Sequence, residues 1–186
     1  MKKILTVVGW AIFAAACNSN APVITSDSAK MNHDTVVMAR DIQSPYPIGY
    51  SSKFAMGNAK YAENVLTLWK DYDNGTLSAH KDFFADSMTA YLGNGGMMHA
   101  SRDSVIAGIQ RHRNMMSAAV DRVDAVMAVK STDKNEDWVL IWGTEVDTHK
   151  NGKVDSVDLQ ETWRINKDGK ADMILQYVRP YPTAKK

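Results

Sequence analysis

The chain is organised around residues 137–179, which read DWVLIWGTEVDTHKNGKVDSVDLQETWRINKDGKADMILQYVR. Two dipeptides with strong turn preference, Asn151-Gly152 and Asp168-Gly169, divide this stretch into three segments of strand-like composition. Asn-Gly and Asp-Gly supply the positive φ angles that tight hairpin loops require. The stretch therefore predicts three consecutive antiparallel strands joined by two short turns.

The middle strand carries an acidic residue in an otherwise apolar phase. Alternate residues of a strand point to the same face, and here they are Val157, Leu159, Glu161, Trp163 and Ile165. We therefore expect Glu161 to point inward. A carboxyl group in an apolar interior needs a partner or a function. It can line a ligand pocket with a raised pKa, pair with an arginine or buried waters, or be exposed if the phase is misjudged.

The segments before this stretch predict helices first and strands later. Apolar residues at helical spacing run from Ala62 to Tyr72, and Asn74-Gly75 is typical of a helix end. We expect a short helix over 77–84, strands over 88–92 and 97–100, and a third helix capped by Ser101. A strand over 120–129 follows, with Val123, Ala125, Met127 and Val129 on one face. This order predicts an α+β fold, with three helices on a curved, mostly antiparallel sheet.

Composition and charge exclude some classes of partner. The 186 residues are 45% hydrophobic and 23% charged, with a formal net charge of +1. These values are ordinary for a globular protein, and no basic run interleaved with aromatic residues is present, so we expect no nucleic acid partner. Cys17 is the single cysteine, which rules out an intramolecular disulfide framework.

The first 17 residues, MKKILTVVGWAIFAAAC, place two lysines before a short apolar run that ends in small residues at Cys17. The run is too short to span a bilayer and has the length of a signal-peptide core. Its end resembles the lipobox of bacterial lipoproteins, although Ala14 stands where that motif usually has Leu. The resemblance implies cleavage before Cys17, lipid on its thiol and new amino terminus, and a membrane-anchored place in the bacterial cell envelope, outside the cytoplasm. An ordinary cleaved signal and an uncleaved anchor are the alternatives.

The expected organisation has four parts. A signal peptide covers 1–16, and the lipidated cysteine with a flexible tether covers 17–53. The folded domain covers 54–182, and a short tail covers 183–186. The tether is rich in Ser, Asn, Asp, Thr and Pro and lacks a sustained period.

Several motifs give the domain a family resemblance. They are Tyr72-Asp73-Asn74-Gly75, Phe83-Phe84-Ala85-Asp86, His99-Ala100-Ser101-Arg102, the hairpin from Glu161 to Lys170, and Gln176-Tyr177. With them the chain resembles the NTF2-like superfamily, specifically the SnoaL-like branch of polyketide cyclases and ketosteroid isomerases. The resemblance implies a cone in which a bent sheet and three helices enclose a pocket. It also implies a homodimer through the outer face of the sheet.

The resemblance carries over the isomerase positions only in part. Glu161 takes the place of the oxyanion-stabilising aspartic acid, Tyr91 stands where the proton-shuttling base is found, and Leu68 falls near the oxyanion-hole tyrosine. One of three positions keeps a carboxyl group. The resemblance therefore argues against ketosteroid isomerase activity.

The candidate site residues follow from these considerations. Glu161 with Tyr91 or His99 is the candidate acid–base set. Aromatic walls with a few polar groups are typical of small-molecule pockets, and the candidate ligand contacts are Trp69, Tyr72, Asp86, Trp142, Trp163 and Tyr177. The aromatic residues can equally be plain core, and His99 can be a surface loop histidine. No spacing indicates a metal site or a cofactor motif, so we expect neither.

Three functions are open from the sequence. The leading one is binding of a small, mostly apolar molecule in the cone pocket. The second is a proton-transfer enzyme such as an isomerase, cyclase or dehydratase. The third is a non-catalytic dimeric envelope module with a collapsed pocket and an apolar outer sheet face, for which the expected residues are Val139, Ile141, Gly143, Ile174 and Val178.

Overall fold

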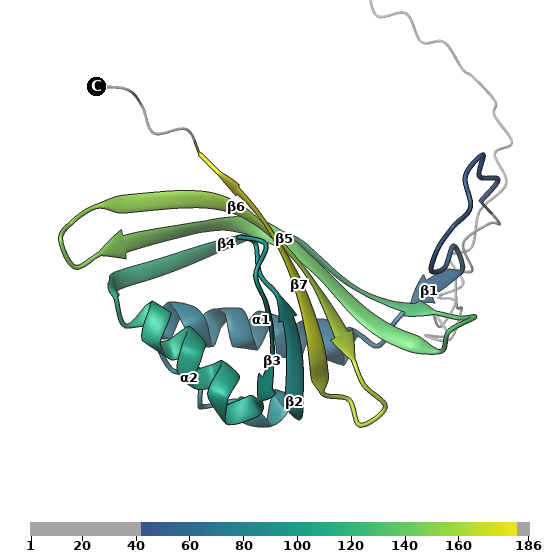
Figure 1. Ribbon diagram of the computed structural model, residues 1–186, viewed down its shortest axis with the longest axis horizontal. Helices are drawn as coiled ribbons and strands as arrows, with labels where there is room; N and C mark the ends of the chain where they lie inside the picture. The colour runs from purple at the N-terminus through teal and green to yellow at the C-terminus, as the bar shows by residue number, and fades with distance from the viewer. Residues whose placement is uncertain (1–41, 182–186) are drawn as a thin grey trace, which may run out of the picture. The chain divides into compact units, whose positions relative to one another are not determined.

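A long antiparallel meander dominates the structure (Figure 1). The computed structural model describes residues 42–181, so the predicted signal peptide and Cys17 lie outside the described residues. The elements in chain order are β1 (Phe54–Met56), α1 (Ala59–Asn74), η1 (Lys81–Phe83), β2 (Phe84–Tyr91), β3 (Met97–Ser101), α2 (Arg102–Arg113), β4 (Met116–Ser131), β5 (Glu136–His149), β6 (Val154–Ile165) and β7 (Ala171–Pro180).

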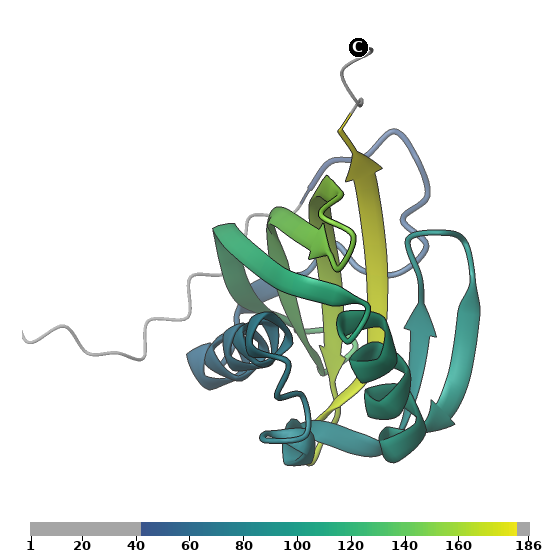
Figure 2. The ribbon, with the colours of Figure 1, turned by 90° about the vertical axis from the view of Figure 1, so that its left-hand side faces the viewer.

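All seven of these strands belong to one sheet, in the order β1-β4-β5-β6-β7-β2-β3. Among the described strands, β2 and β7 form the one parallel pair, and the other neighbours are antiparallel. Figures 1 and 2 show the sheet curving around α1 and α2, which lie next to each other on its concave side. The predicted α+β class with a curved, mostly antiparallel sheet is confirmed.

Helix α1 begins and ends at residues whose side chains suit those positions. The Asn58 side chain accepts a hydrogen bond from the Lys60 N–H at 3.0 Å, as an N-cap does. Gly75 closes the helix with a φ of 69°, a left-handed conformation that glycine adopts without strain. The buried face carries Leu68 and Trp69, so the predicted helix and its Asn-Gly end are confirmed.

Two of the three predicted α-helices are present among the described residues, and the middle one is not. The predicted helix over 77–84 is a turn followed by the single 3₁₀ turn η1. Phe84 is already extended, is almost fully buried, and pairs with Ala171 of β7. A segment this short cannot offset the cost of nucleating a helix, so pairing with the sheet decides its conformation.

The third predicted helix is present as α2. Ser101 caps it by accepting a hydrogen bond from the Ser104 N–H at 3.4 Å, as expected from the sequence. Val105 and Ile106 bury its apolar face. The helix therefore packs its first turns against the strands that form the interior.

The two predicted hairpin turns are confirmed. Gly152 and Gly169 have φ angles of 82° and 74°. In the first turn the His149 N–H donates to the Lys153 carbonyl at 2.8 Å, and the Gly152 N–H donates back to the His149 carbonyl at 2.9 Å. The loop therefore has three residues, with glycine in the left-handed position.

The phase predicted for β6 is confirmed, and the phases predicted for β5 and β7 are wrong. Glu161 and Trp163 of β6 are buried, and they pair with Ile141 and Val139 of β5. Paired residues of antiparallel strands share a face. The residues that we expected on the outer face lie inside; they are Val139, Ile141, Gly143, Ile174 and Val178.

Strand β4 changes phase along its length. A register shift between Val123 and Ala125 pairs Val123 with Gly143 but Ala125 with Trp142, which places these two residues on opposite faces. The single face predicted for residues 123–129 is therefore wrong. Gly143 lies opposite this bulge, where an added Cβ would stand 2.1 Å from the Arg122 carbonyl oxygen, so only glycine fits there.

Candidate functional site

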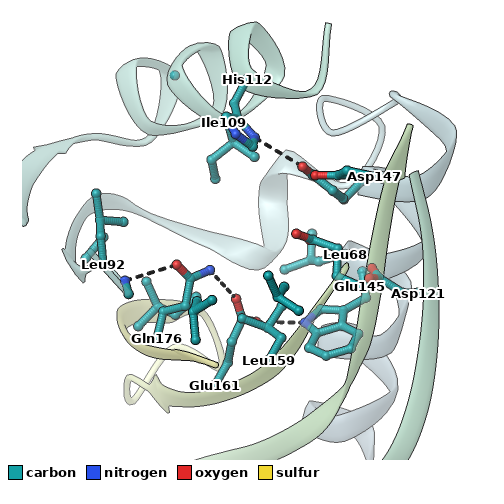
Figure 3. Close-up of a pocket in the computed structure, with 18 of the residues that line it drawn as sticks. Leu68, Leu92, Ile109, His112, Asp121, Glu145, Asp147, Leu159, Glu161 and Gln176 are labelled. Carbon is teal, nitrogen blue, oxygen red and sulfur yellow. Dashed lines mark hydrogen bonds between the residues drawn. The ribbon is translucent and has the colours of Figure 1, made fainter. Parts of the chain in front are cut away.

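A cavity of about 830 Å³ lies between the two α-helices and the concave face of the sheet (Figure 3). Its volume falls in the range of about 300–1,000 Å³ that is typical of small-molecule pockets. Its wall is mainly apolar and aromatic, with contributions from Leu68, Trp69, Leu77, Phe84, Met88, Met98, Val105, Ile109, Leu159, Trp163 and Ile174. Such a wall favours a ligand with a largely apolar body.

Glu161 of β6 lines this cavity and is only 5% exposed. Its Oε2 accepts hydrogen bonds from two indole nitrogens, Trp69 Nε1 at 2.7 Å and Trp163 Nε1 at 3.0 Å. Its Oε1 accepts a third from Gln176 Nε2 at 3.1 Å. The carboxyl group thus meets three N–H donors, and the pair with an arginine considered from the sequence is not formed.

Gln176 is itself held in one orientation. The backbone N–H of Gly93 donates to Gln176 Oε1 at 3.2 Å, which turns the amide nitrogen toward Glu161. The network therefore joins α1, β6, β7 and the loop after β2 (Figure 3). Because Oε2 of Glu161 already accepts two hydrogen bonds and Oε1 only one, Oε1 keeps an acceptor position.

Burial raises the pKa of Glu161 above its ordinary value, and the hydrogen bonds from Trp69, Gln176 and Trp163 oppose that shift. Indole N–H groups can only donate, so they favour the ionised, accepting form. The arrangement suits a group that accepts a hydrogen bond from a bound molecule.

Besides Glu161 and Asp155, three more carboxyl groups line the cavity. Asp121 on β4 lies directly opposite Glu145 on β5, and Asp147 is the next residue of β5 with the same phase. Figure 3 shows Asp121 and Glu145 side by side. Burial, reinforced by the neighbouring negative charges, raises the pKa of Asp121 to about 8 and that of Glu145 to about 7. Burial also raises the pKa of Asp147.

Tyr72 and His112 form a polar pair in the same wall. The Tyr72 hydroxyl and His112 Nδ1 are 3.1 Å apart, and both residues line the cavity. Burial raises the pKa of Tyr72, which keeps its hydroxyl protonated and able to donate.

Several of the residues proposed from the sequence meet in this cavity. Glu161, Trp69, Tyr72 and Trp163 all line it. The two tryptophans act on Glu161 directly, through their indole N–H groups. Their roles in binding or catalysis remain predictions.

Other candidates lie elsewhere. Trp142 and Tyr177 are 36% and 58% exposed, and both pair with Gln160 on the outer face of the sheet. Tyr91 is 41% exposed, and His99 is hydrogen-bonded to Thr89 at 3.0 Å. None of these four lines the cavity, because strand alternation turns each of them away from it. The predicted set of Glu161 with Tyr91 or His99 is therefore not assembled.

Asp86 also lies outside the cavity. Its carboxylate is exposed and stands 3.4 Å from Arg102 Nη1. It borders a separate shallow hollow together with Lys170 and Asp172. Its position is that of a surface ion-pairing residue.

Sequence reasoning missed Asp121, Glu145, Asp147 and Gln176 as residues of the cavity wall. Glu145 and Asp147 continue the phase of Ile141 and Gly143. The alternation was therefore the signal that could have found them, once β5 is set in the correct phase.

Within residues 42–181, no group of three or more His, Cys, Asp or Glu side chains has an arrangement suited to a metal ion. None of the helices in that range is long and apolar enough to cross a membrane.

Comparisons with known proteins give structural but not sequence matches. No protein-family model matches the chain. No curated protein matches its sequence.

Solved structures match over about two thirds of the chain. An NTF2-like protein of unknown function from Exiguobacterium sp. 255-15 has a TM-score of 0.52 and 16% identity, covering 64% of this chain and 99% of that one. An LEH-like epoxide hydrolase from M. tuberculosis has a TM-score of 0.54 and 9% identity, and the match covers 65% of this chain and 84% of that one. SalBIII, an epoxide hydrolase/cyclase-like enzyme in pyran ring formation, has a TM-score of 0.51 and 12% identity, and the match covers 65% of this chain and 92% of that one.

Identities this low establish architecture rather than activity. The neighbours include an NTF2-like protein and cyclase- or epoxide-hydrolase-like enzymes, and what they share with this chain is the fold. From the order of its strands, the helices on its concave face and these similarities, the chain has the NTF2-like fold.

Proposed function

We propose that this chain binds a small, mostly apolar molecule in the cavity between α1, α2 and the sheet, at a membrane of the bacterial cell envelope. The observation that carries the proposal is the cavity itself, about 830 Å³ with a mainly apolar wall. Protein interiors are close-packed, and voids much larger than a water molecule are few. A hollow of this size is therefore better explained by a ligand than by imperfect packing.

The polar groups support the same proposal. A ligand pocket combines an apolar wall with a few polar groups that fix the orientation of the ligand. Here Glu161 Oε1 supplies a hydrogen-bond acceptor. The Tyr72–His112 pair and the Asp121–Glu145 pair supply further polar groups. An open cavity also argues against the purely assembling module, for which we expected a collapsed interior.

A cavity-filling variant tests the proposal. Ala90 is buried and lines the cavity, so we expect Ala90→Phe to fill part of it and to abolish binding of the neutral apolar dye Nile red. Ala125 faces the opposite side of the sheet beside Trp142, so Ala125→Phe is the matched control and should bind the dye like the parent. Equal dye binding by both variants, with both folded by circular dichroism, would refute the proposal.

The membrane anchor rests on the sequence of residues 1–17 alone. A Cys17→Ser variant removes the thiol that would carry the lipid. We expect the parent chain to sediment with membranes after expression in a bacterium that processes lipoproteins, and the variant to leave that fraction. Retention of Cys17→Ser on the membranes would show that another feature anchors the chain.

Proton transfer is the second candidate function, because burial in the cavity raises the pKa of Asp121 to about 8 and that of Glu145 to about 7. Groups with such pKa values are suited to acid–base catalysis near neutral pH. Two similar structures are named as an epoxide hydrolase and a cyclase-like enzyme. Both activities involve proton movement at a bound substrate.

The general-base probe 5-nitrobenzisoxazole tests this candidate. We expect ring opening that speeds up as pH rises through about 7 and falls at least about tenfold in Glu145→Gln. An Asp124→Asn variant removes an exposed carboxylate of the same strand as Asp121 and should not change the rate. A parent rate equal to that of Glu145→Gln would exclude Glu145 as the base.

A further inference from the structure

Apart from Tyr72, His112 and His149, the titratable side chains that line the cavity are all acidic. They include the carboxyl groups of Asp121, Glu145, Asp147, Asp155 and Glu161, while no Lys or Arg lines it within the described part of the chain. The whole sequence carries a formal charge of only +1. The acidity therefore belongs to the cavity rather than to the protein as a whole.

These carboxyl groups differ in whether the protein supplies their partners. Glu161 accepts three N–H hydrogen bonds, and Asp155 is paired with His149 and Lys153 at 2.7 and 2.8 Å. The side chains of Asp121, Glu145 and Asp147 have no hydrogen-bond or salt-bridge partner among residues 42–181. We call these three residues the acidic end of the cavity.

Burial makes the missing partners costly. Asp147 is only 7% exposed, and its Oδ1 and the Oδ1 of Asp121 are both buried without a hydrogen-bond partner. A buried polar atom that is left unpaired costs about 1–3 kcal/mol, and more if it is charged. Such an atom in the wall of an open cavity points to a partner that arrives with the ligand.

The arrangement of the strands adds to this cost. Asp121 and Glu145 are direct cross-strand neighbours on the inner face, and Asp147 follows Glu145 on the same face. Like charges placed directly opposite each other on a sheet are destabilising. A cation between them would remove the repulsion.

The nearby basic side chains of the protein are already engaged. Arg113 donates to the backbone carbonyls of Tyr72 and Asp73 at 2.8 Å each, and His112 is bonded to the Tyr72 hydroxyl. His112, His149 and Arg113 lower the pKa of Asp147 through space, but none of them is bonded to the carboxyl groups of the acidic end, so a ligand can supply a direct cationic partner.

We propose that the acidic end formed by Asp121, Glu145 and Asp147 binds a cationic nitrogen, and that the ligand of this cavity is an apolar amine. The inference rests on the proposed function, since it assigns a chemical class to the molecule in the same cavity. An organic cation fits better than a metal ion, because these carboxyl groups lack a metal-binding arrangement and the remaining wall is apolar. The ammonium group would meet the carboxylates while the apolar body lies against residues such as Leu68, Val105 and Ile109.

Three probes of equal size separate charge from hydrophobicity. They are 4-phenylbutylamine, 4-phenylbutan-1-ol and 4-phenylbutyrate, measured by calorimetry and thermal shift with the full chain at pH 7.5. We expect the amine to bind at least about tenfold more tightly than the alcohol, and the carboxylate to bind most weakly. Equal affinities of amine and alcohol would overturn the proposal while leaving apolar binding intact.

Variants locate the cation. Glu145→Gln and, independently, Asp147→Asn should each weaken amine binding by about tenfold and leave alcohol binding unchanged. The control Asp124→Asn removes an exposed carboxylate paired with Arg122 and should leave both affinities unchanged. Unchanged amine binding in both cavity variants would refute the proposed subsite.

The same measurements separate this proposal from the more general one. If none of the three probes binds to the parent, and Ala90→Phe behaves like Ala125→Phe toward Nile red, both proposals fail together. If the alcohol binds and Ala90→Phe abolishes its binding, the apolar site is supported. The relative affinities of the amine and the alcohol then decide whether the ligand is a cation.

Discussion

At the scale of single residues, the cavity holds two kinds of acidic group. Glu161 meets three N–H donors from three elements, so its burial is compensated and it fixes the geometry of the wall. Asp121 and Glu145 have no such donors, and burial raises their pKa values to about 8 and 7. Glu161 therefore supports the fold, whereas Asp121 and Glu145 lower the stability of the protein when they are ionised.

The hydrogen bond between Glu161 and Gln176 predicts that exchanging the two side chains restores the stability that either single substitution removes. In Glu161→Gln the new amide nitrogen faces the amide nitrogen of Gln176, which Gly93 holds in place. We expect a loss of about 1–3 kcal/mol in unfolding free energy from this unpaired donor. Gln176→Glu alone should also destabilise, because it brings two carboxyl groups together.

The double variant Glu161→Gln, Gln176→Glu restores donor and acceptor, because Glu at 176 accepts from both Gly93 and the new amide. We expect most of the lost stability to return in urea unfolding, with a coupling energy well above 0.5 kcal/mol. Additive losses in the double variant would show that these side chains do not interact as described.

The acidic end predicts an unusual pH dependence. Between the ordinary pKa of Glu145, 4.5, and its folded value of about 7, the folded state binds more protons than the unfolded state. Stability from this group is therefore complete below about pH 4 and is lost as pH rises toward 8. Charged or titratable side chains that act on this cluster are Tyr72, Asp73, His112, Arg113, Asp121, Asp147, His149, Asp155 and Glu161.

Glu145→Gln isolates the contribution of one carboxyl group. We expect the variant to be about 1–3 kcal/mol more stable than the parent at pH 8 and nearly equal to it at pH 4. Urea unfolding at the two pH values measures the difference, and Asp124→Asn serves as the exposed comparison. A variant that is less stable than the parent at pH 8 would contradict the raised pKa.

The inward direction of Glu161 was predictable from the sequence, because the residues two positions before and after it in the strand, Leu159 and Trp163, are apolar. The directions of Asp121 and Glu145 were not, since they depend on how neighbouring strands are aligned. A β4 bulge and a hairpin loop set that alignment. Alternation within β4 or β5 shows which residues share a face, but not which of the two faces points into the cavity.

At the scale of elements, one loop residue decides which aromatic side chains reach the cavity. A two-residue loop at Asn151-Gly152 would pair Trp142 with Glu161. The observed loop contains Lys150 as well, so that Ile141 pairs with Glu161 and Trp142 turns outward. The Asn-Gly signal marks both kinds of turn, which is why the position of the hairpin was correct and the phase of β5 was not.

The contact between β4 and β5 predicts an intolerant glycine. A methyl group at Gly143 would lie 2.1 Å from the Arg122 carbonyl oxygen and 3.0 Å from its carbonyl carbon. Because this neighbour is backbone, we expect Gly143→Ala to cost at least about 1–3 kcal/mol of stability by forcing the strands apart.

Gly49→Ala is the matched control, since no other atom lies within 4 Å of its added Cβ. Thermal unfolding of the two variants should show a clear loss for the first and little change for the second. If Gly143→Ala unfolds at the parent temperature, the bulge does not press on β5 as described.

At the scale of the whole molecule, the outer face of the sheet has an uncharged centre. Two neighbouring rows cross β4, β5, β6 and β7 without an ionisable group other than one tyrosine. They are Ala125, Trp142, Gln160 and Tyr177, and Met127, Leu140, Thr162 and Leu175. The adjacent row, which contains Arg122, Asp158 and Arg179, is charged.

An uncharged centre with a charged rim is typical of protein interfaces, and the covering partner that we propose is a second copy of this chain. We expect a dimer by sedimentation at micromolar concentration. Trp142→Glu should make it monomeric, since a buried charge without a partner is costly in an interface. Lys167→Glu, in the exposed turn between β6 and β7, should leave the dimer intact. A parent that sediments as a monomer would refute the second copy as the occupant of this face.

Because Trp142 faces away from the cavity, the monomeric variant should still bind Nile red, which separates assembly from ligand binding.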